Sequence, residues 1–310
     1  MNKPAFDPNN RMSPPGLPAH LADAINPDTP TTGVPTPRVS RAFYMGDFKI
    51  TSLLDVTGLQ NDPKSEYAKE VPQAEWEQVS KDNFLSIEEL QFFITPTLIE
   101  TPKERILIDA GMGKGGLTAS LAEAGVSPES IDVVIITHLH PDHIGGLMSE
   151  GRPTFPNARY VAGAVEYDFW KKMPLDMLPA KLVKMMFTPL AEKTTFIGAG
   201  ETTVSGIAAI ESFGHSPGHL CFMLESQGQQ IMLTADLANH YVWSFAKPDW
   251  AFGFDGDTDM ASKSRREVLG MLAADKIPMI GYHMPFPGVG HVETREDGFR
   301  FVPFTYQMHG

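Results

Sequence analysis

Three imidazoles and a carboxylate lie within six residues of this chain, at His138, His140, Asp142 and His143. Imidazole nitrogens and carboxylate oxygens are common ligands of divalent transition metals. Residues two positions apart in an extended chain point to the same side, so His138 and His140 can bind one ion together. Pro141 then turns the chain, which lets Asp142 and His143 face a second position. The motif therefore predicts a metal site and leaves room for two metal ions.

A buried strand over residues 131–136 is expected to position this motif, because a short β-branched run ends directly before the histidines. Three further candidate ligands also follow apolar, strand-like segments, namely His215, Asp236 and His283. Strand ends that meet at one edge of a sheet can bring side chains from distant parts of a sequence together. The sequence therefore predicts a site assembled from several strand ends.

Strand-like and helix-like stretches alternate along the rest of the chain. The expected elements are a strand at 48–54, hairpins at 96–108 and 221–233, and helices at 117–124 and 259–274. Strands with interspersed helices, and candidate ligands at the strand ends, favour two facing sheets covered by helices.

These residues resemble the signature of the metallo-β-lactamase superfamily, HxHxDH followed by a distant His, Asp and His in that order. The resemblance runs from about Arg41 to the C-terminus and includes residues 106–111, which look like the family's strand and aspartate–glycine turn. The segments at 46–51, 225–229 and 285–291 look most like the methyl parathion hydrolase branch. The resemblance implies an α/β fold, an αββα sandwich in which two facing mixed sheets are covered by helices.

The resemblance also implies how the ligands divide between two divalent metal ions. One ion would be held by imidazoles alone, those of His138, His140 and His215. The other would be held by a mixed set, Asp142, His143 and His283, and Asp236 would bridge the two ions. Zinc is the expected metal, and manganese, iron or cobalt would suit the same ligands. Two such ions would lower the pKa of a bridging water and supply hydroxide, with Asp142 and Asp236 as the catalytic carboxylates.

The expected activity is metal-dependent hydrolysis of a neutral ester, a class that includes phosphotriesters, aryl esters and lactones. An N-acyl homoserine lactonase is the first alternative, although that family usually has a tyrosine three residues after the bridging aspartate, where this chain has Asn239. A mononuclear iron enzyme that oxidises sulfur substrates is the second alternative. The number and identity of the bound metals would separate these classes.

Two residues outside the ligand set could orient ligands. Asp109 follows a predicted strand and either orients a ligand histidine or forms the turn, and both interpretations stay open. His219 is interpreted as a turn-stabilising or ligand-orienting histidine. The segments 165–188 and 241–254 are rich in aromatic residues and methionine and look like insertions over the site. Their side chains either pack onto the body or line an apolar substrate pocket, for which the candidates are Trp170, Phe187, Trp243 and Phe245.

The charge balance limits the class of partner. A formal net charge of −13, from 25 basic and 38 acidic residues, disfavours nucleic acid and anionic membranes. No apolar stretch is long enough to suggest a transmembrane segment. Cys221 is the only cysteine, which excludes an intrachain disulfide and a paired-cysteine redox site. The expected partner is therefore a neutral small-molecule ester.

The first 40 residues differ in composition from the rest, since they contain nine of the 26 prolines and show no periodicity. Because proline fixes φ and removes a hydrogen-bond donor, we expect an extended arm over residues 1–40 and one hydrolase domain over residues 41–310. The arm either wraps the domain, reaches the second subunit of an expected homodimer or stays disordered. It lacks the basic start and apolar core of a signal peptide. A cytoplasmic location is expected, or a periplasmic one if an export signal has been removed.

Overall fold

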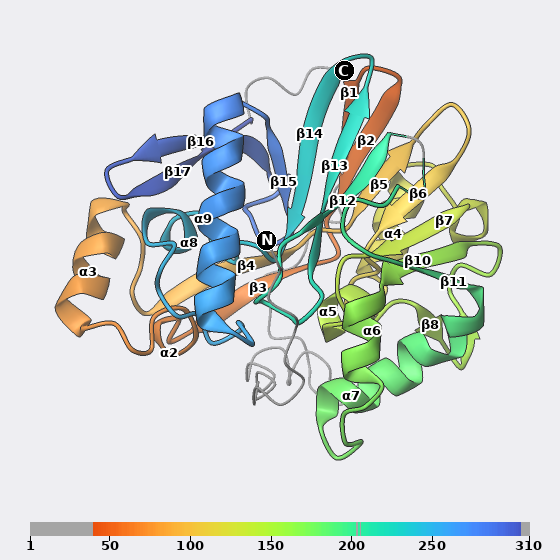
Figure 1. Ribbon diagram of the computed structural model, residues 1–310, viewed down its shortest axis with the longest axis horizontal. Coiled ribbons are helices and arrows are strands. Elements are labelled where there is room, and N and C mark those ends of the chain that lie inside the picture. The colour runs from red at the N-terminus through yellow and green to blue at the C-terminus, as the bar shows by residue number, and fades with distance from the viewer. Residues whose placement is uncertain (1–39, 203, 205, 305–310) are drawn as a thin grey trace, which may run out of the picture.

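Two β-sheets, one of seven strands and one of six, form the centre of the protein. The computed structural model describes residues 40–202, 204 and 206–304. Helices lie on the two outer sides of the sheets, with α9 on one side and α4 and α6 on the other (Figure 1). The predicted arm lies outside the described residues except for Ser40, with which β1 begins.

The seven-stranded sheet is mixed, and its order is β1-β2-β5-β6-β7-β10-β11. Neighbours pair antiparallel from β1 to β6 and parallel from β6 to β11. All four residues of β7 are buried, as expected for a strand that is covered on both faces. The strands are β1 (Ser40–Met45), β2 (Phe48–Leu53), β5 (Thr97–Glu100), β6 (Arg105–Ile108), β7 (Val133–Ile136), β10 (Arg159–Gly163) and β11 (Thr194–Ile197).

The six-stranded sheet follows chain order from β12 to β17. Its β14–β15 pair is parallel, whereas the other neighbours are antiparallel. The strands are β12 (Ile207–Glu211), β13 (Leu220–Ser226), β14 (Gln229–Ala235), β15 (Met279–Gly281), β16 (Val289–Arg295) and β17 (Gly298–Pro303). Both predicted hairpins are confirmed, as β5–β6 and β13–β14.

The alternation of side chains along the strands divides the core into an inner layer and two outer layers. Ile135 of β7 and Leu233 of β14 belong to one buried cluster between the sheets. Their neighbours Val134 and Met232 point the opposite way and pack in separate clusters under the helices. The predicted αββα sandwich is therefore confirmed.

The helices include the two that the sequence predicts, as α4 and α9. Asp257 begins α9 by accepting a hydrogen bond from the backbone N–H of Met260, at 2.9 Å. Among the described residues, no helix is both long and apolar enough to cross a bilayer. The α-helices are α2 (Lys64–Tyr67), α3 (Gln73–Asp82), α4 (Gly116–Glu123), α5 (Pro141–Ile144), α6 (Ala164–Trp170), α7 (Leu178–Leu182), α8 (Trp243–Ala246) and α9 (Thr258–Asp275). The 3-10 helices are η1 (Pro128–Ser130) and η3 (Thr188–Lys193), and η2 (Val183–Phe187) is a π-helix.

A subdomain between β2 and β5 was not predicted. It consists of the antiparallel pair β3 (Val56–Asn61) and β4 (Glu89–Ile94) together with α2 and α3. It packs against α8, where the rings of Trp76 and Trp243 have centroids 4.2 Å apart. A second small antiparallel pair is formed by β8 (Met148–Ser149) and β9 (Arg152–Pro153). The tryptophans belong to a buried aromatic cluster that joins sequence-distant segments, which local patterns do not reveal.

Candidate metal centre

The seven predicted ligands come together at one edge of the sandwich in two groups. The first group contains His138, His140 and His215. The second contains Asp142, His143, Asp236 and His283. Within each group the nearest ligand atoms lie within 4.8 Å of one another, which is close enough for one ion to contact all of them. The division matches the one implied by the resemblance, with Asp236 on the side of the second group.

Ends of strands from both sheets supply these side chains. The HxHxDH segment follows β7 and continues into α5, whose first residue is Pro141. Asp236 follows β14, and His283 follows β15. His215 lies in the loop between β12 and β13, directly after Gly214. A side chain at Gly214 would place its Cβ 2.1 Å from the backbone nitrogen of Ala261, so only glycine allows this loop to approach α9.

Asp236 lies between the two groups. Its Oδ1 is 3.0 Å from Nε2 of His143, and its Oδ2 is 3.0 Å from Nε2 of His283. The same Oδ2 is 3.3 Å from Nε2 of His215 and 3.9 Å from Nε2 of His138, both in the first group. A carboxylate in this position is able to contact two ions at once.

The donor atoms of the centre fit divalent cations, because several have no other partner. Among the described residues, buried atoms without a hydrogen bond include Nε2 of His138, Nε2 of His143, Oδ2 of Asp142 and Oδ1 of Asp236. Burying unpartnered polar atoms is costly, and a metal ion would satisfy them together. These nitrogen and oxygen donors support binding of divalent metals at this edge.

The electrostatics of the centre favour different protonation states for different ligands in the metal-free protein. Burial, together with the neighbouring His143 and His140, lowers the pKa of His138 well below its ordinary value, which keeps the ring neutral. Burial alone would raise the pKa of Asp236, but the charges of His283 and His143 hold it well below its ordinary value. Burial alone would lower the pKa of His143 and His215, but nearby carboxylates raise the pKa of His143 well above its ordinary value and that of His215 to about 9. Neutral imidazole and ionised carboxylate are the forms that bind metal ions, so metal binding would release protons from these two histidines.

Asp109 combines both interpretations that its sequence position left open. Its backbone has a φ of 62°, which is a turn conformation, and its side chain is completely buried. Its Oδ2 accepts a hydrogen bond from Nδ1 of His143 at 2.8 Å, and Oδ1 accepts one from the backbone N–H of Thr137 at 2.9 Å. This contact directs Nε2 of His143 toward the second ligand group.

His219 contacts the backbone of Asp236 and belongs to neither ligand group. Its Nε2 accepts a hydrogen bond from the backbone N–H of Asp236 at 3.1 Å, and its Nδ1 contacts Oγ of Ser212 at 2.8 Å. Burial lowers the pKa of His219 to about 3, with a further contribution from His215, so the ring stays neutral and can accept this bond. The structure thus gives His219 a contact suited to orienting a ligand.

Other contacts to the ligands were missed at the sequence level. Nδ1 of His215 lies 3.2 Å from Oδ1 of Asp255, whose Oδ2 accepts a hydrogen bond from the buried guanidinium of Arg265 at 2.7 Å. Nδ1 of His283 donates to the carbonyl oxygen of Phe93 in β4, at 2.8 Å. The aromatic run before Asp255 was a signal that its carboxylate could be buried with a partner, whereas Arg265 lies among polar and charged residues and carried no such signal.

The four predicted pocket residues have packing roles. Phe187, Trp243 and Phe245 have no exposed surface, and Trp170 is 2% exposed. Phe245 lies in the cluster under α9, and Phe187 lies in the cluster on the outer face of the seven-stranded sheet. The prediction that these side chains line an open pocket is therefore corrected, because a side chain without exposed surface cannot contact a substrate in this conformation.

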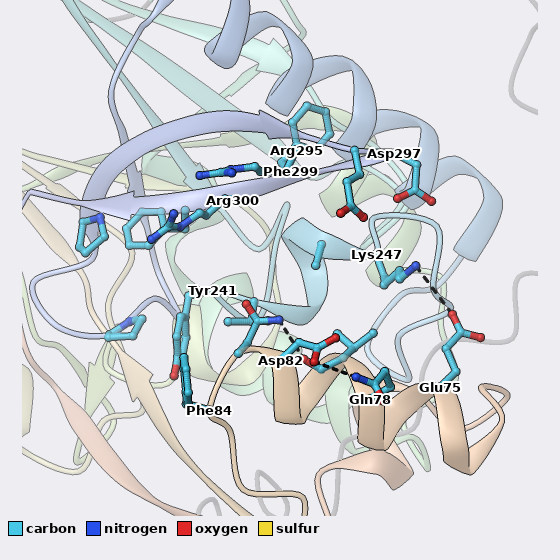
Figure 2. Close-up of a pocket in the computed structure, with 18 of the residues that line it drawn as sticks. Glu75, Gln78, Asp82, Phe84, Tyr241, Lys247, Arg295, Asp297, Phe299 and Arg300 are labelled. Atoms are coloured by element: carbon cyan, nitrogen blue, oxygen red, sulfur yellow. Dashed lines mark hydrogen bonds and ion pairs between the residues drawn. The ribbon is translucent and has the colours of Figure 1, made fainter.

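An open groove of about 1060 Å³ lies between α3, α8, the loop after His283 and β16–β17. Figure 2 shows Phe84, Tyr241 and Arg300 toward one end, with Lys247 paired to Glu75 at the other end. None of the predicted metal ligands or pocket residues lines it. The walls carry both charge signs, with Glu75 and Lys247 among the lining residues.

Comparisons with known proteins agree with this geometry. A sequence profile described as Metallo-beta-lactamase superfamily matches residues 91–282. The solved structure of AidC, a dizinc quorum-quenching lactonase in complex with a product, N-hexanoyl-L-homoserine, is 29% identical, with a TM-score of 0.81 over 86% of this chain and 97% of that chain. The solved structure of hydrolase AbOPH in the beta lactamase superfamily is 26% identical, with a TM-score of 0.79 over 86% of this chain and 98% of that chain.

Curated relatives match over very different lengths. An N-acyl homoserine lactonase of Bacillus cereus is 23% identical over 66% of this chain and 84% of its own length. The exodeoxyribonuclease WalJ of Streptococcus pneumoniae is 45% identical over only 49 residues, 16% of this chain and 18% of that protein. The lactonase structures do not single out the methyl parathion hydrolase branch that the sequence segments suggested. The profile covers more than half of the chain and includes every predicted ligand except His283, so the chain belongs to the metallo-beta-lactamase superfamily of metal-dependent hydrolases.

Proposed function

We propose that this protein is a dinuclear metal-dependent lactonase, with N-acyl homoserine lactones as its leading substrate class. One observation carries the dinuclear part of the proposal, namely the position of Asp236 between two separate groups of ligand atoms. The likeness to a lactonase structure over almost its full length supports the substrate class. The proposed function is therefore the lactonase, which the sequence analysis gave as the first alternative to general ester hydrolysis.

The chain's own residues would hold this centre in a form that suits hydrolysis. When bound, two divalent ions would activate a water molecule and polarise the carbonyl oxygen of the lactone. Asn239 donates a hydrogen bond from Nδ2 to Oδ2 of Asp236 at 3.2 Å, which helps to fix the proposed bridging carboxylate. His219 accepts a hydrogen bond from the backbone of Asp236, and Asp109 accepts one from His143. Both ligands are thereby held in place. Zinc is the metal we propose, and the homodimer remains a prediction.

Asn239 also favours a second candidate function. It occupies the position at which lactonases of this fold usually have a tyrosine, and its amide is already engaged with Asp236. A site without that hydroxyl would depend less on lactone-specific contacts, which favours hydrolysis of neutral aryl esters and phosphotriesters. These substrates are therefore proposed as the alternative class.

Substrate turnover and metal content test the proposal together. The purified protein, loaded with zinc or manganese, would be assayed with N-hexanoyl homoserine lactone, an aryl ester and a phosphotriester. We expect the lactone to give the highest kcat/KM and metal analysis to give two ions per chain. One iron per chain would favour the sulfur-oxidising alternative, and a higher kcat/KM for either other ester would replace the lactonase proposal.

Asp236→Asn tests whether Asp236 bridges the two metal positions. Because asparagine cannot bridge two cations as a charged carboxylate does, we expect weaker occupancy of both metal positions and a loss of turnover by about two orders of magnitude or more. Circular dichroism should show a retained fold. Wild-type turnover by the variant would refute Asp236 as the bridge.

A further inference from the structure

Glu166 is a buried residue whose two carboxylate oxygens accept four hydrogen bonds, and it belongs to neither ligand group. It lies in the first turn of α6 and is 1% exposed. Its Oε1 accepts hydrogen bonds from the backbone N–H of Leu139 at 3.0 Å and from Nε1 of Trp170 at 2.7 Å. Its Oε2 accepts bonds from Oγ of Ser216 and the backbone N–H of Gly218, each at 2.8 Å. The carboxylate is therefore bonded to three separate parts of the chain.

Two of these parts carry the all-imidazole ligand group. Leu139 lies between His138 and His140, and Ser216 follows His215 directly. Glu166 therefore joins the loop of His140 to the loop of His215, and Nδ1 of His140 lies 3.0 Å from Nε2 of His215. The loop after His215 also packs directly on α6, because a Cβ on Gly218 would lie 2.3 Å from the backbone nitrogen of Glu166.

A carboxylate suits this location for a physical reason. Its two oxygens accept hydrogen bonds only, so all four donors can be satisfied at once, and a buried charge is tolerated when it is bonded in this way. Two of the donors are backbone amides, whose positions define the course of each loop. The contacts therefore fix the spacing of the two loops independently of a metal ion. Asp109 makes a comparable buried contact to His143 in the other ligand group.

We propose that Glu166 is a positioning residue that holds the loops of His140 and His215 at the spacing needed for the first metal position. The inference rests on the proposed metal function of these histidines. It gives the segment at 165–188 a role at the centre, although the sequence suggested only packing or a substrate pocket. Glu166 acts through the loop backbones and touches neither ligand group directly.

Glu166→Gln tests this role, because an amide group keeps the shape but replaces one acceptor oxygen with a donor. The new N–H₂ group would then face either the N–H groups of Leu139 and Trp170 or the hydroxyl of Ser216 and the N–H of Gly218. At least one donor would lose its acceptor, and the loops would be held less firmly. Stepwise binding of zinc would be measured by competition with a chromophoric chelator. Cadmium NMR would report which position is occupied, since all-nitrogen and mixed donor sets differ in chemical shift. We expect the affinity of the all-imidazole position to fall about tenfold, with the mixed position unchanged.

Trp170→Phe is the matched control, since it removes one hydrogen bond to Glu166, keeps an aromatic ring beside His140, whose centroid is 5.9 Å away, and leaves the bonds to both loops. We expect lower thermal stability and wild-type affinity at both metal positions. Ser216→Ala removes one loop contact with little risk to folding and should give a smaller loss at the same position as Glu166→Gln. Equal losses at both positions, wild-type affinities in Glu166→Gln and Ser216→Ala, or the same loss in Trp170→Phe would overturn the inference. A wild-type protein that binds no divalent metal would instead overturn the proposed function and the inference with it.

Discussion

Replacing Asp109 by asparagine would test whether a buried carboxylate selects the metal-binding form of His143. In the wild type, Oδ2 of Asp109 accepts a hydrogen bond from Nδ1 of His143 at 2.8 Å and another from Oγ1 of Thr137 at 2.8 Å. With Nδ1 carrying the proton, Nε2 is left free to bind a metal. An amide at this position would present N–H to Nδ1 and favour the tautomer whose proton lies on Nε2. Asp109→Asn should therefore weaken the second metal position.

The magnitude follows from the contacts that are lost. Partners that orient ligand histidines contribute about 10- to 100-fold to metal affinity, which corresponds to about 1.4–2.8 kcal/mol. The metal-free protein should lose about 1.5–3 kcal/mol of unfolding free energy, as expected for a buried hydrogen bond to a charged group. Both losses should appear together, because one contact is responsible for both.

The assay is zinc competition with a chromophoric chelator, combined with urea unfolding of the metal-free protein. Thr137→Ser serves as the control, because it keeps the hydroxyl that bonds to Asp109 and removes only a methyl group. We expect Asp109→Asn to weaken the position that contains His143 and to leave the all-imidazole position unchanged. Wild-type affinity at both positions, with the expected loss of stability, would refute the tautomer argument.

Asp55 and Phe245 allow two further tests away from the metal ligands. Burial raises the pKa of Asp55 to about 6 from 3.8, although it accepts hydrogen bonds from the backbone N–H groups of Met112 and Leu117. The folded state therefore binds a proton more readily than the unfolded state, and this contribution to stability falls by about 2 kcal/mol as pH rises from about 4 to about 6. Urea unfolding of the metal-free protein at both pH values should show this fall in the wild type but not in Asp55→Asn. Phe245→Ala should cost about 3–5 kcal/mol of unfolding free energy, because removing a fully buried ring leaves a cavity. The KM of the variant should equal that of the wild type. A changed KM with wild-type stability would instead support the prediction that Phe245 lines a substrate pocket.

The sequence predicted the sandwich because its elements have strong local signals. The buried run that became β7 is β-branched throughout, and the hairpin β13–β14 has a Gln227–Gly228 turn between two apolar runs. The subdomain of β3, β4, α2 and α3 was missed because it is stabilised by a cluster that joins Trp76 to Trp243 and other distant residues. Packing of this kind depends on contacts that no local pattern contains.

The sequence by itself determined which side chains can hold metal ions. The types and spacing of His138, His140, Asp142 and His143 restrict the chemistry, because few other arrangements place so many donors in one turn. Only the tertiary structure decided what holds those ligands in place. Asp109, Glu166 and Asp255 lie on other elements, and a buried carboxylate finds its partners through the folded chain rather than through sequence spacing.

The same reason explains why the sequence could not identify the residues of a substrate pocket. Aromatic residues in the segment at 241–254 have the same composition whether they line a cavity or fill a core, so their sequence could not separate the two roles. Only the folded structure, by burying Trp243 and Phe245 completely, decided that they pack. Burial is set by what lies opposite a side chain, and that neighbour comes from elsewhere in the chain.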